Sequence, residues 1–414
     1  MTKIKVVHLI AGNINGGAAR GAYWLHKGLL EQGIDSTIIT SSELTLGEPE
    51  IIGILNEENK ELYKNNLQSE KKILSEYSNK SAELFSTGLF GFKLKSLDKI
   101  KKSDIIHLHW VNDNFLDISE LSLFNKPIIW TLRDMWPITG GCHYAINCER
   151  YKSKCGKCPL LGSEIESDLS EFVQQRKEDL LPKDIYYVGI SKWITEQARL
   201  SQILRGKKVS TIANCIDTLE YFPIDKSQSR SILGINTPKK IILIGATRIK
   251  DSYKGFNLLK NVLGNLDKEK YFLAVFGAVN DADISQFGFE YKRFGYLYDT
   301  VSLRLVYSAS DVFLCTSTLE AFGKTVAESM SCGTPVVCFD CCGPSEIVEH
   351  NTSGYKAKPY DTQDMVNGIN HICFSPNYKD ISSSANKRIL NFFDKSKAAE
   401  KYAKLYLSIK SGSN

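Results

Sequence analysis

The feature that most constrains the fold of this chain is the regular alternation of short apolar, β-rich runs with helix-patterned segments. This alternation is typical of βαβ units, which place their strands side by side in a parallel sheet. The pattern restarts after about Asn214, and 414 residues are enough for two domains that each have a core. We therefore expect an α/β protein of two doubly wound domains with a ligand cleft between them.

The individual elements can be placed from the apolar runs and their spacing. We expect strands at 4–10, 36–40, 105–109, 127–132 and 185–190 in the first half, and at 209–212, 240–245, 271–276, 312–315 and 335–339 in the second. Helical patterns cover 20–31, 256–265, 300–308, 325–332 and 395–409. We divide the chain into an N-terminal domain, 1–195, a C-terminal domain, 196–394, and a last helical segment, 395–414, that packs on the N-terminal domain. The first domain carries an insertion at 56–102 and a cysteine-rich loop at 135–162.

Composition and the N-terminus bear on location and partners. A net charge of +5 is too mild to indicate nucleic acid binding. The first apolar run is short and broken by His8, which favours a buried strand over a secretory signal, and no run approaches the ~18 residues of a membrane span. We expect a cytoplasmic protein. The lysine-rich insertion is either a solvated helical face or a basic surface for anionic lipid, so peripheral contact with the inner face of the membrane stays open.

The motif with the most specific chemistry is Glu320-Ala-Phe-Gly-Lys-Thr-Val-Ala-Glu328, in which two carboxylates flank a glycine turn that opens an expected helix. Unpaired amides at a helix start attract anions, phosphate above all. Glu320 precedes this turn, and Glu328 lies about two to three turns into the helix. One carboxylate is then placed for a sugar and the other for a ribose, which suits a nucleotide-sugar.

Two other loops follow expected strands. The loop that contains Gly16 and Gly17 lets the backbone approach a ligand closely, and its spacing is not the Gly-x-Gly-x-x-Gly of dinucleotide sites. Arg248 and Lys254 follow the strand at 240–245. These two cations either neutralise a diphosphate leaving group or belong to an ordinary solvated loop.

The glycine loop, the two cations and the glutamate pair occur in the order seen in family-4 retaining glycosyltransferases of GT-B fold, which the chain resembles from Lys3 to about Leu407. The resemblance implies a fold of two Rossmann-like domains and a role for each motif. Gly16 and Gly17 would face the donor phosphates and the reacting centre. Arg248 and Lys254 would bind the diphosphate.

The resemblance also implies how the glutamate segment binds the rest of the donor. Glu320 would hold hydroxyls of the transferred sugar, and Glu328 would hold the ribose hydroxyls. The other donor-binding residues are the phosphate-binding turn, Phe322, Gly323, Lys324 and Thr325, and the border of the base, Tyr296 and Leu297. Cations and helix amides can stabilise the leaving diphosphate without a catalytic metal.

One departure from the family pattern concerns the place of a histidine near the transferred sugar. Arg133 stands there, in Thr131-Leu132-Arg133-Asp134, and arginine cannot act as an acid or base near neutral pH. It would instead bind a sugar carboxylate, the diphosphate or Asp134. His109 sits near the C-terminal end of its strand, where such clefts form, and either compensates or is a packed, hydrogen-bonded histidine.

The cysteine-rich loop contains a Cys-x5-Cys-x6-Cys-x2-Cys array made by Cys142, Cys148, Cys155 and Cys158. Four thiolates within this span can hold a tetrahedral zinc ion as a structural clip. Free thiols and disulfides are the alternatives, and His143 either replaces one ligand or points to the acceptor.

The expected function is retaining transfer of a hexosyl group from a UDP- or GDP-linked donor. The acceptor is a saccharide or a lipid-linked saccharide, and bacterial cell-surface polysaccharide biosynthesis is the setting that the resemblance implies. A GT-B nucleotide-sugar epimerase or hydrolase, or a non-catalytic nucleotide-sugar-binding partner, is the alternative.

Overall fold

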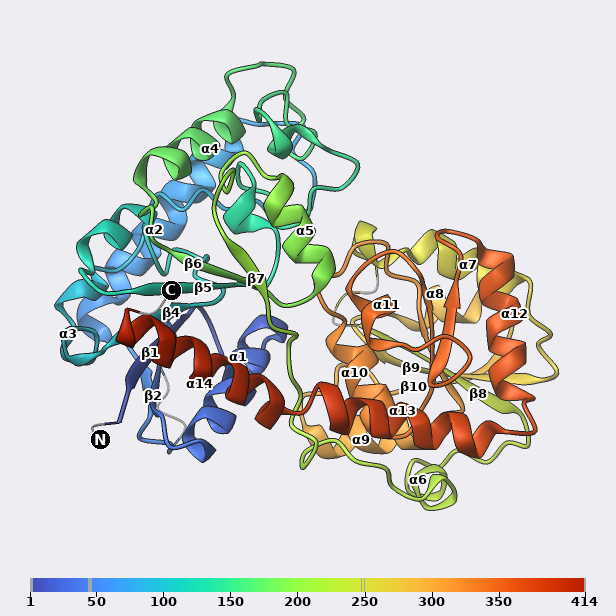
Figure 1. Cartoon of the computed structure of the whole chain (residues 1–414). Coiled ribbons are helices and arrows are strands. Elements are labelled where there is room, and N and C mark those ends of the chain that lie inside the picture. The colour runs from blue at the N-terminus through green and yellow to red at the C-terminus, as the bar shows by residue number, and fades with distance from the viewer. Residues whose placement is uncertain (1–2, 44–46, 247, 249, 413–414) are drawn as a thin grey trace. The chain divides into compact units, whose positions relative to one another are not determined.

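The computed structural model describes residues 3–43, 47–246, 248 and 250–412 (Figure 1). The chain forms two compact units, Met1–Asn214 with Ala398–Asn414, and Cys215–Lys397. Each unit contains one parallel sheet and its own apolar core.

The first unit has a seven-stranded sheet with the order β3-β2-β1-β4-β5-β6-β7, in which every neighbouring pair is parallel. Its strands are β1 (Lys5–Ile10), β2 (Asp35–Thr40), β3 (Ile51–Gly53), β4 (Ile105–Leu108), β5 (Ile128–Leu132), β6 (Tyr186–Gly189) and β7 (Val209–Thr211). Its helices are α1 (Gly17–Glu31), α2 (Glu57–Ser75), α3 (Asp98–Lys102), α4 (Leu169–Leu180) and α5 (Lys192–Leu200), with short 3-10 turns η1 (Leu94–Ser96), η2 (Ile118–Leu123), η3 (Trp136–Ile138) and η4 (Arg150–Lys152).

The prediction that 209–212 belongs to the second half of the fold is wrong. This segment forms β7, which pairs with β6 through Tyr187 and Val209 and closes the first sheet. The first unit consequently runs to Asn214, past the expected boundary at residue 195. An apolar run carries no mark of the sheet that it joins, because the pairing partner is chosen by tertiary packing.

The second unit has a six-stranded sheet with the order β10-β9-β8-β11-β12-β13, again parallel throughout. Its strands are β8 (Lys240–Ala246), β9 (Tyr271–Gly277), β10 (Glu290–Arg293), β11 (Val312–Cys315), β12 (Val336–Phe339) and β13 (Gly354–Ala357). Its helices are α6 (Lys226–Ile232), α7 (Phe256–Gly264), α8 (Asp281–Ser285), α9 (Thr300–Ala309), α10 (Lys324–Ser331), α11 (Gly343–Ile347), α12 (Thr362–Cys373) and α13 (Tyr378–Phe392), with the 3-10 turn η5 (Ser252–Lys254).

Both sheets reverse their strand order once, and this reversal positions the candidate site. In the first sheet β1 lies beside β4, and in the second sheet β8 lies beside β11. The loops that leave these strands run to opposite sides, so they open a crevice at the carboxyl ends of the strands. The glycine loop follows β1, and the loops with Lys254 and Glu320 follow β8 and β11.

The last helix is α14 (Lys395–Ser411; Figure 1), and from Ala398 on it belongs to the first unit. Two of its tyrosines, Tyr402 and Tyr406, are buried. The Tyr406 hydroxyl lies 2.7 Å from His107 Nδ1, and the Tyr402 hydroxyl lies 2.6 Å from Thr131 Oγ1. Both partners are on central strands of the sheet. The tyrosine stripe is therefore a core-packing face whose hydroxyls are satisfied by hydrogen bonds.

The insertion at 56–102 contains the long helix α2 at its start and the turn η1 and the short helix α3 at its end, which agrees with the predicted helical stretches. Asn56 caps α2 through a reciprocal hydrogen bond with Asn59. Its charged residues are balanced, with Glu57, Glu58, Glu61 and Glu70 against Lys60, Lys64, Lys71 and Lys72. In the part of the chain that the structure describes, none of the helices has the length and apolar character needed to cross a membrane.

Candidate functional site

The centre of the candidate site in the second unit is an ion pair between Lys254 and Glu320, two residues that the sequence singled out separately. Lys254 ends the turn after β8, and Glu320 lies in the loop after β11. Burial opposes the charge on Lys254, and the Glu320 carboxylate outweighs it and raises the pKa of the ammonium. The pair is partly buried, so the lysine is a fixed cation at the carboxyl ends of the central strands β8 and β11.

Local backbone geometry holds these two loops together. Gly255 has φ +70°, and a Cβ there would stand 2.1 Å from the Thr316 carbonyl oxygen. Only glycine fits this close approach. Thr316 Oγ1 donates a 2.9 Å hydrogen bond to the Lys254 carbonyl, and the Thr318 amide donates to Tyr253 O.

The glycine turn between the glutamates forms as the sequence predicts. Gly323 has φ +100° and caps α10, which begins at Lys324. The Gly343 amide donates to the Glu320 carbonyl at 2.9 Å, and a Cβ on Gly343 would meet the backbone of Phe322 at 2.6 Å. This tight packing orders the turn, and the first amides of α10 form an anion-attracting helix start.

Glu328 lies on α10 and is only 1% exposed. Its two carboxylate oxygens are engaged, one by the Tyr307 hydroxyl at 2.9 Å and the other by Lys324 Nζ at 2.7 Å. A ribose that binds Glu328 would have to replace the contact from Lys324, whose side chain is partly exposed. The ribose role of Glu328 stays a prediction.

The remaining residues predicted for the donor lie at the surface of the second unit. Arg248 is exposed and its Nε lies 3.3 Å from an Asp251 oxygen. Tyr296 is exposed and Leu297 is half-buried in the segment after β10. The Tyr296 ring lies 4.5 Å from the ring of Tyr298, so two accessible aromatic faces stand next to each other. Such faces suit a nucleobase.

The glycine loop of the first unit follows β1 and ends where α1 begins. Gly16 is the cap of α1 and Gly17 is its first residue, and both are exposed. A Cβ on Gly17 would meet no heavy atom within 4 Å, and one on Gly16 would meet only Asn13 O at 3.5 Å. The loop therefore leaves open space over the first amides of a fifteen-residue helix.

Arg133 follows β5 and is fixed by three neighbours. Its Nη1 donates to Asn214 Oδ1 at 2.5 Å, and its Nη2 lies 3.3 Å from His109 Nδ1. A Cβ on Gly21 would stand 2.5 Å from Nη1, so α1 leaves room for the guanidinium only because it has a glycine there. His109, the residue that the sequence offered as compensation, is thus a direct neighbour of Arg133.

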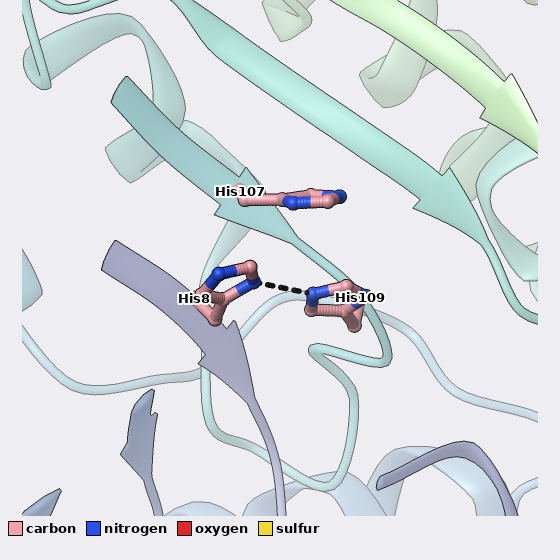
Figure 2. A group of neighbouring side chains, drawn as sticks. All are labelled: His8, His107 and His109. Atoms are coloured by element: carbon pink, nitrogen blue, oxygen red, sulfur yellow. Dashed lines mark hydrogen bonds between the residues drawn. The ribbon is translucent and has the colours of Figure 1, made fainter. Parts of the chain in front are cut away.

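Three histidines, His8 on β1, His107 on β4 and His109 directly after β4, form a buried group (Figure 2). Arg133 contacts this group through His109. His8 Nδ1 and His109 Nε2 share a 2.9 Å hydrogen bond, and both nitrogens of His107 lie 2.7 Å from hydroxyls. Burial lowers the pKa of all three imidazoles well below its usual value, and Arg133 adds to the effect.

These nitrogens lie within 4.8 Å of one another, which is close enough for a metal ion. The contacts favour a different reading. The hydroxyls of Thr131 and Tyr406 already occupy both nitrogens of His107, and the guanidinium of Arg133 stands against His109. A cation placed here would face a fixed positive charge. The group is a neutral hydrogen-bonded stack that supports Arg133.

A second buried network lies after the same strands. His143 Nδ1 lies 2.6 Å from Asp134 Oδ2, and His143 Nε2 lies 3.0 Å from the Ser86 hydroxyl. Trp110 Nε1 also donates to Asp134 Oδ2, at 2.9 Å. The carboxylate fixes the imidazole, so this histidine has a defined orientation at the carboxyl edge of the sheet.

Sequence reasoning missed several of these partners. Ser86 lies in the insertion and Tyr307 on a helix with an ordinary apolar pattern, so neither carried a chemical signal. Asn214 was noted only as the point where the pattern restarts. The signal for Trp110 and Asp134 was their place directly after the expected strands at 105–109 and 127–132.

Comparisons with known proteins find similarity within the second unit and along most of the chain. Residues 225–388 match the family model of the Glycosyl transferases group 1. The chain is similar to the putative colanic acid biosynthesis glycosyl transferase WcaC of Escherichia coli K12, at 22% identity over 354 residues that cover 81% of this chain and 82% of that protein.

Solved structures show the same fold. Sucrose-phosphate synthase of Thermosynechococcus elongatus matches with a TM-score of 0.69 at 15% identity, covering 99% of this chain and 100% of that one. Alr3699/HepE of Anabaena in complex with UDP-glucose matches with a TM-score of 0.63 at 18% identity, covering 98% and 100%. The expected fold class of GT-B, with two doubly wound α/β units, is confirmed.

Proposed function

We propose that this chain, which is a glycosyltransferase, moves a sugar from a nucleotide diphosphate donor to a saccharide or lipid-linked saccharide with retention of configuration. The observation that carries the proposal is the Lys254–Glu320 pair, set at the strand-order reversal of the second sheet and followed by the turn that opens α10. A cation, a carboxylate and a helix start together suit a phosphorylated sugar.

The chemistry assigned to these groups is stabilisation of the departing diphosphate. Breaking the bond between sugar and phosphate builds negative charge on the leaving group. Lys254, Arg248 and the amides of Phe322, Gly323, Lys324 and Thr325 bind that charge. This set of cations and dipoles supports a transfer that uses no catalytic metal. Glu320, held by Lys254, binds hydroxyls of the transferred sugar.

The nucleoside part of the donor is assigned to Glu328, Tyr296 and Leu297. A carboxylate accepts hydrogen bonds from the two ribose hydroxyls, and an aromatic face stacks on the base. The solved complexes of Alr3699/HepE contain UDP and UDP-glucose. They support a UDP-linked donor, with a GDP-linked donor as the second choice to be tested.

The first unit is assigned to the reacting centre and the acceptor. Gly16 and Gly17 leave open space for phosphate and sugar, and Arg133 with His109 offers a fixed cation where the family has a histidine. The similarity to WcaC supports cell-surface polysaccharide biosynthesis as the setting. A cytoplasmic location with contact at the inner face of the membrane would follow from a lipid-linked acceptor, although the balanced charge of α2 gives anionic lipid little to attract.

The test is an assay that measures release of the nucleoside diphosphate, UDP or GDP, from the donor. The full chain is incubated with UDP- and GDP-sugars, with and without bacterial lipid-linked saccharides, and both products are followed by mass spectrometry. Release that requires acceptor and yields an elongated saccharide is the expected result. Release without acceptor would instead establish a hydrolase or epimerase, and binding without any release would establish a non-catalytic partner.

A further inference from the structure

The cysteine-rich loop folds its four cysteines around one place. A small cavity in the first unit is lined by Cys142, Cys148, Cys155 and Cys158, together with aromatic side chains that include Phe85 and Tyr151. Cys155 and Cys158 are buried, and the other two are half-buried. Four cysteines that lie up to sixteen positions apart in the sequence therefore line one cavity. This is the arrangement expected of a four-cysteine metal site.

Hydrogen bonds to the backbone fix three of these cysteines in place. The Thr139 hydroxyl donates to the Cys142 carbonyl at 2.6 Å, and the Cys155 amide donates to Gln174 Oε1 at 2.5 Å. The Cys158 amide donates to Asp168 Oδ2 at 2.8 Å. The backbone therefore holds these cysteines around the cavity, as the outer contacts of a metal site do for its ligands.

A buried lysine holds the segment that leads into Cys142. Lys177 on α4 is 0% exposed, and its Nζ donates to the carbonyls of Trp136 and Thr139 at 2.5 and 2.8 Å. Trp136 and Thr139 lie six and three positions before Cys142. These contacts therefore fix the backbone at the start of the cysteine-rich loop.

We infer that Cys142, Cys148, Cys155 and Cys158 bind one structural zinc ion. Among the described residues, His8, His107 and His109 are the group whose ligand atoms all lie within 4.8 Å of one another. The four cysteine sulfurs lie farther apart than this and would move closer together when they bind the ion. Side-chain rotation about the shared cavity brings them to the Zn–S distance of about 2.3 Å. The ion then joins the segment before η4, which carries Cys142 and Cys148, to the segment after it, which carries Cys155 and Cys158.

This site has a consequence for the neighbouring network, because Cys142 directly precedes His143. Fixing Cys142 fixes the backbone that carries His143 toward Asp134 and Ser86. The zinc ion acts through this loop and touches no substrate. The inference therefore stands on the first unit alone and does not depend on the proposed sugar transfer.

The experiment measures metal in the full chain, purified under reducing conditions without chelator. We expect about one zinc ion per chain by elemental analysis, released when an organomercurial reagent blocks the thiols. Replacement by cobalt gives the visible bands of a tetrahedral thiolate site. Cys158→Ser lowers the zinc content by about tenfold, whereas Cys341→Ser, at a half-buried cysteine of the second unit, leaves it unchanged.

A second variant keeps the test independent of folding failure. Lys177→Met removes the hydrogen bonds to the Trp136 and Thr139 carbonyls and keeps all four thiols, so zinc affinity in competition with a chromophoric chelator falls by about tenfold. Wild-type chain that takes up no zinc from a stoichiometric supply overturns the inference. The inference would also be overturned if peptide mass spectrometry of protein purified under reducing conditions found these four cysteines joined in two disulfides.

Discussion

Lys254 and Glu320 form an ion pair that joins the loop after β8 to the loop after β11, across 66 positions of sequence. The two loops leave neighbouring strands at the point where the order of the second sheet reverses. The pair therefore fixes a cation and a carboxylate where doubly wound sheets bind their ligands.

Lys254→Ala removes the fixed cation assigned to the diphosphate. We expect kcat to fall on the order of 100-fold, because the developing negative charge loses a preorganised partner. Lys260→Ala, at an exposed lysine on α7, is the matched control and leaves kcat unchanged. Equal kinetics in the two variants would remove Lys254 from the site. Glu320→Ala is expected to lower turnover more than donor affinity.

Tyr307→Phe removes the hydroxyl that donates to the buried Glu328 carboxylate. Because that oxygen loses its partner while staying buried, we expect the free energy of unfolding to fall by about 1–3 kcal/mol. Donor affinity falls too, since Glu328 loses a fixed orientation. Tyr291→Phe, at a more exposed tyrosine of the same unit, is the control for denaturant unfolding and for donor titration. Unaltered donor affinity in Tyr307→Phe would argue against a role for Glu328.

Gly21→Ala places a methyl group where Arg133 Nη1 lies, at 2.5 Å. The guanidinium is the far end of a flexible side chain, so it moves and the fold survives. We expect a clear loss of turnover with a small change in thermal midpoint. Gly264→Ala, near the end of α7 with open space around it, tests the general cost of such a change. Full activity in Gly21→Ala would show that the position of Arg133 is unimportant.

The buried histidines predict a pH dependence of stability in the first unit. Burial lowers the pKa of His26 to about 4, and those of His8, His107 and His109 fall well below the usual value. Because the unfolded chain binds protons near pH 6.5 and the folded chain does not, stability is full above that pH and is lost as the pH falls below it.

For His26 alone the loss between pH 7.5 and pH 5 is on the order of 1–2 kcal/mol. Hydrogen exchange of the β1 and β4 amides, followed by mass spectrometry, reports the first unit by itself. His26→Gln should flatten this dependence, whereas His371→Gln, at an exposed histidine, should not. Exchange that is independent of pH, after correction for the intrinsic rate, would mean that these imidazoles bind protons as readily in the folded chain as in the unfolded chain.

Most of the fold was predictable because the buried central strands are continuous apolar runs. β1, β4, β5, β8, β9, β11 and β12 all lie within or next to the predicted ranges. The three strands that were missed, β3, β10 and β13, are all edge strands. β10 reads Glu-Tyr-Lys-Arg, a charged edge sequence with no apolar run.

The candidate site also has a part that the sequence predicted and a part that it did not. Glycines and charges at strand ends were visible in the sequence, and the structure brings Lys254 to Glu320 and His109 to Arg133. The partners that set their orientation were not visible. Tyr307, Asn214 and Ser86 act through contacts between distant segments, and such contacts leave no local pattern.

Calorimetric titration of UDP-glucose measures whether the loops after β8 and β11 bind a sugar linked to a nucleoside diphosphate. We predict one-to-one binding to the wild-type chain and to Lys260→Ala, and affinity at least about tenfold weaker for Lys254→Ala and Glu328→Ala. GDP-glucose is titrated in parallel to cover the second choice of base. Equal affinity of all four proteins for the bound nucleotide-sugar, or no binding of either one to the wild-type chain, would contradict the account.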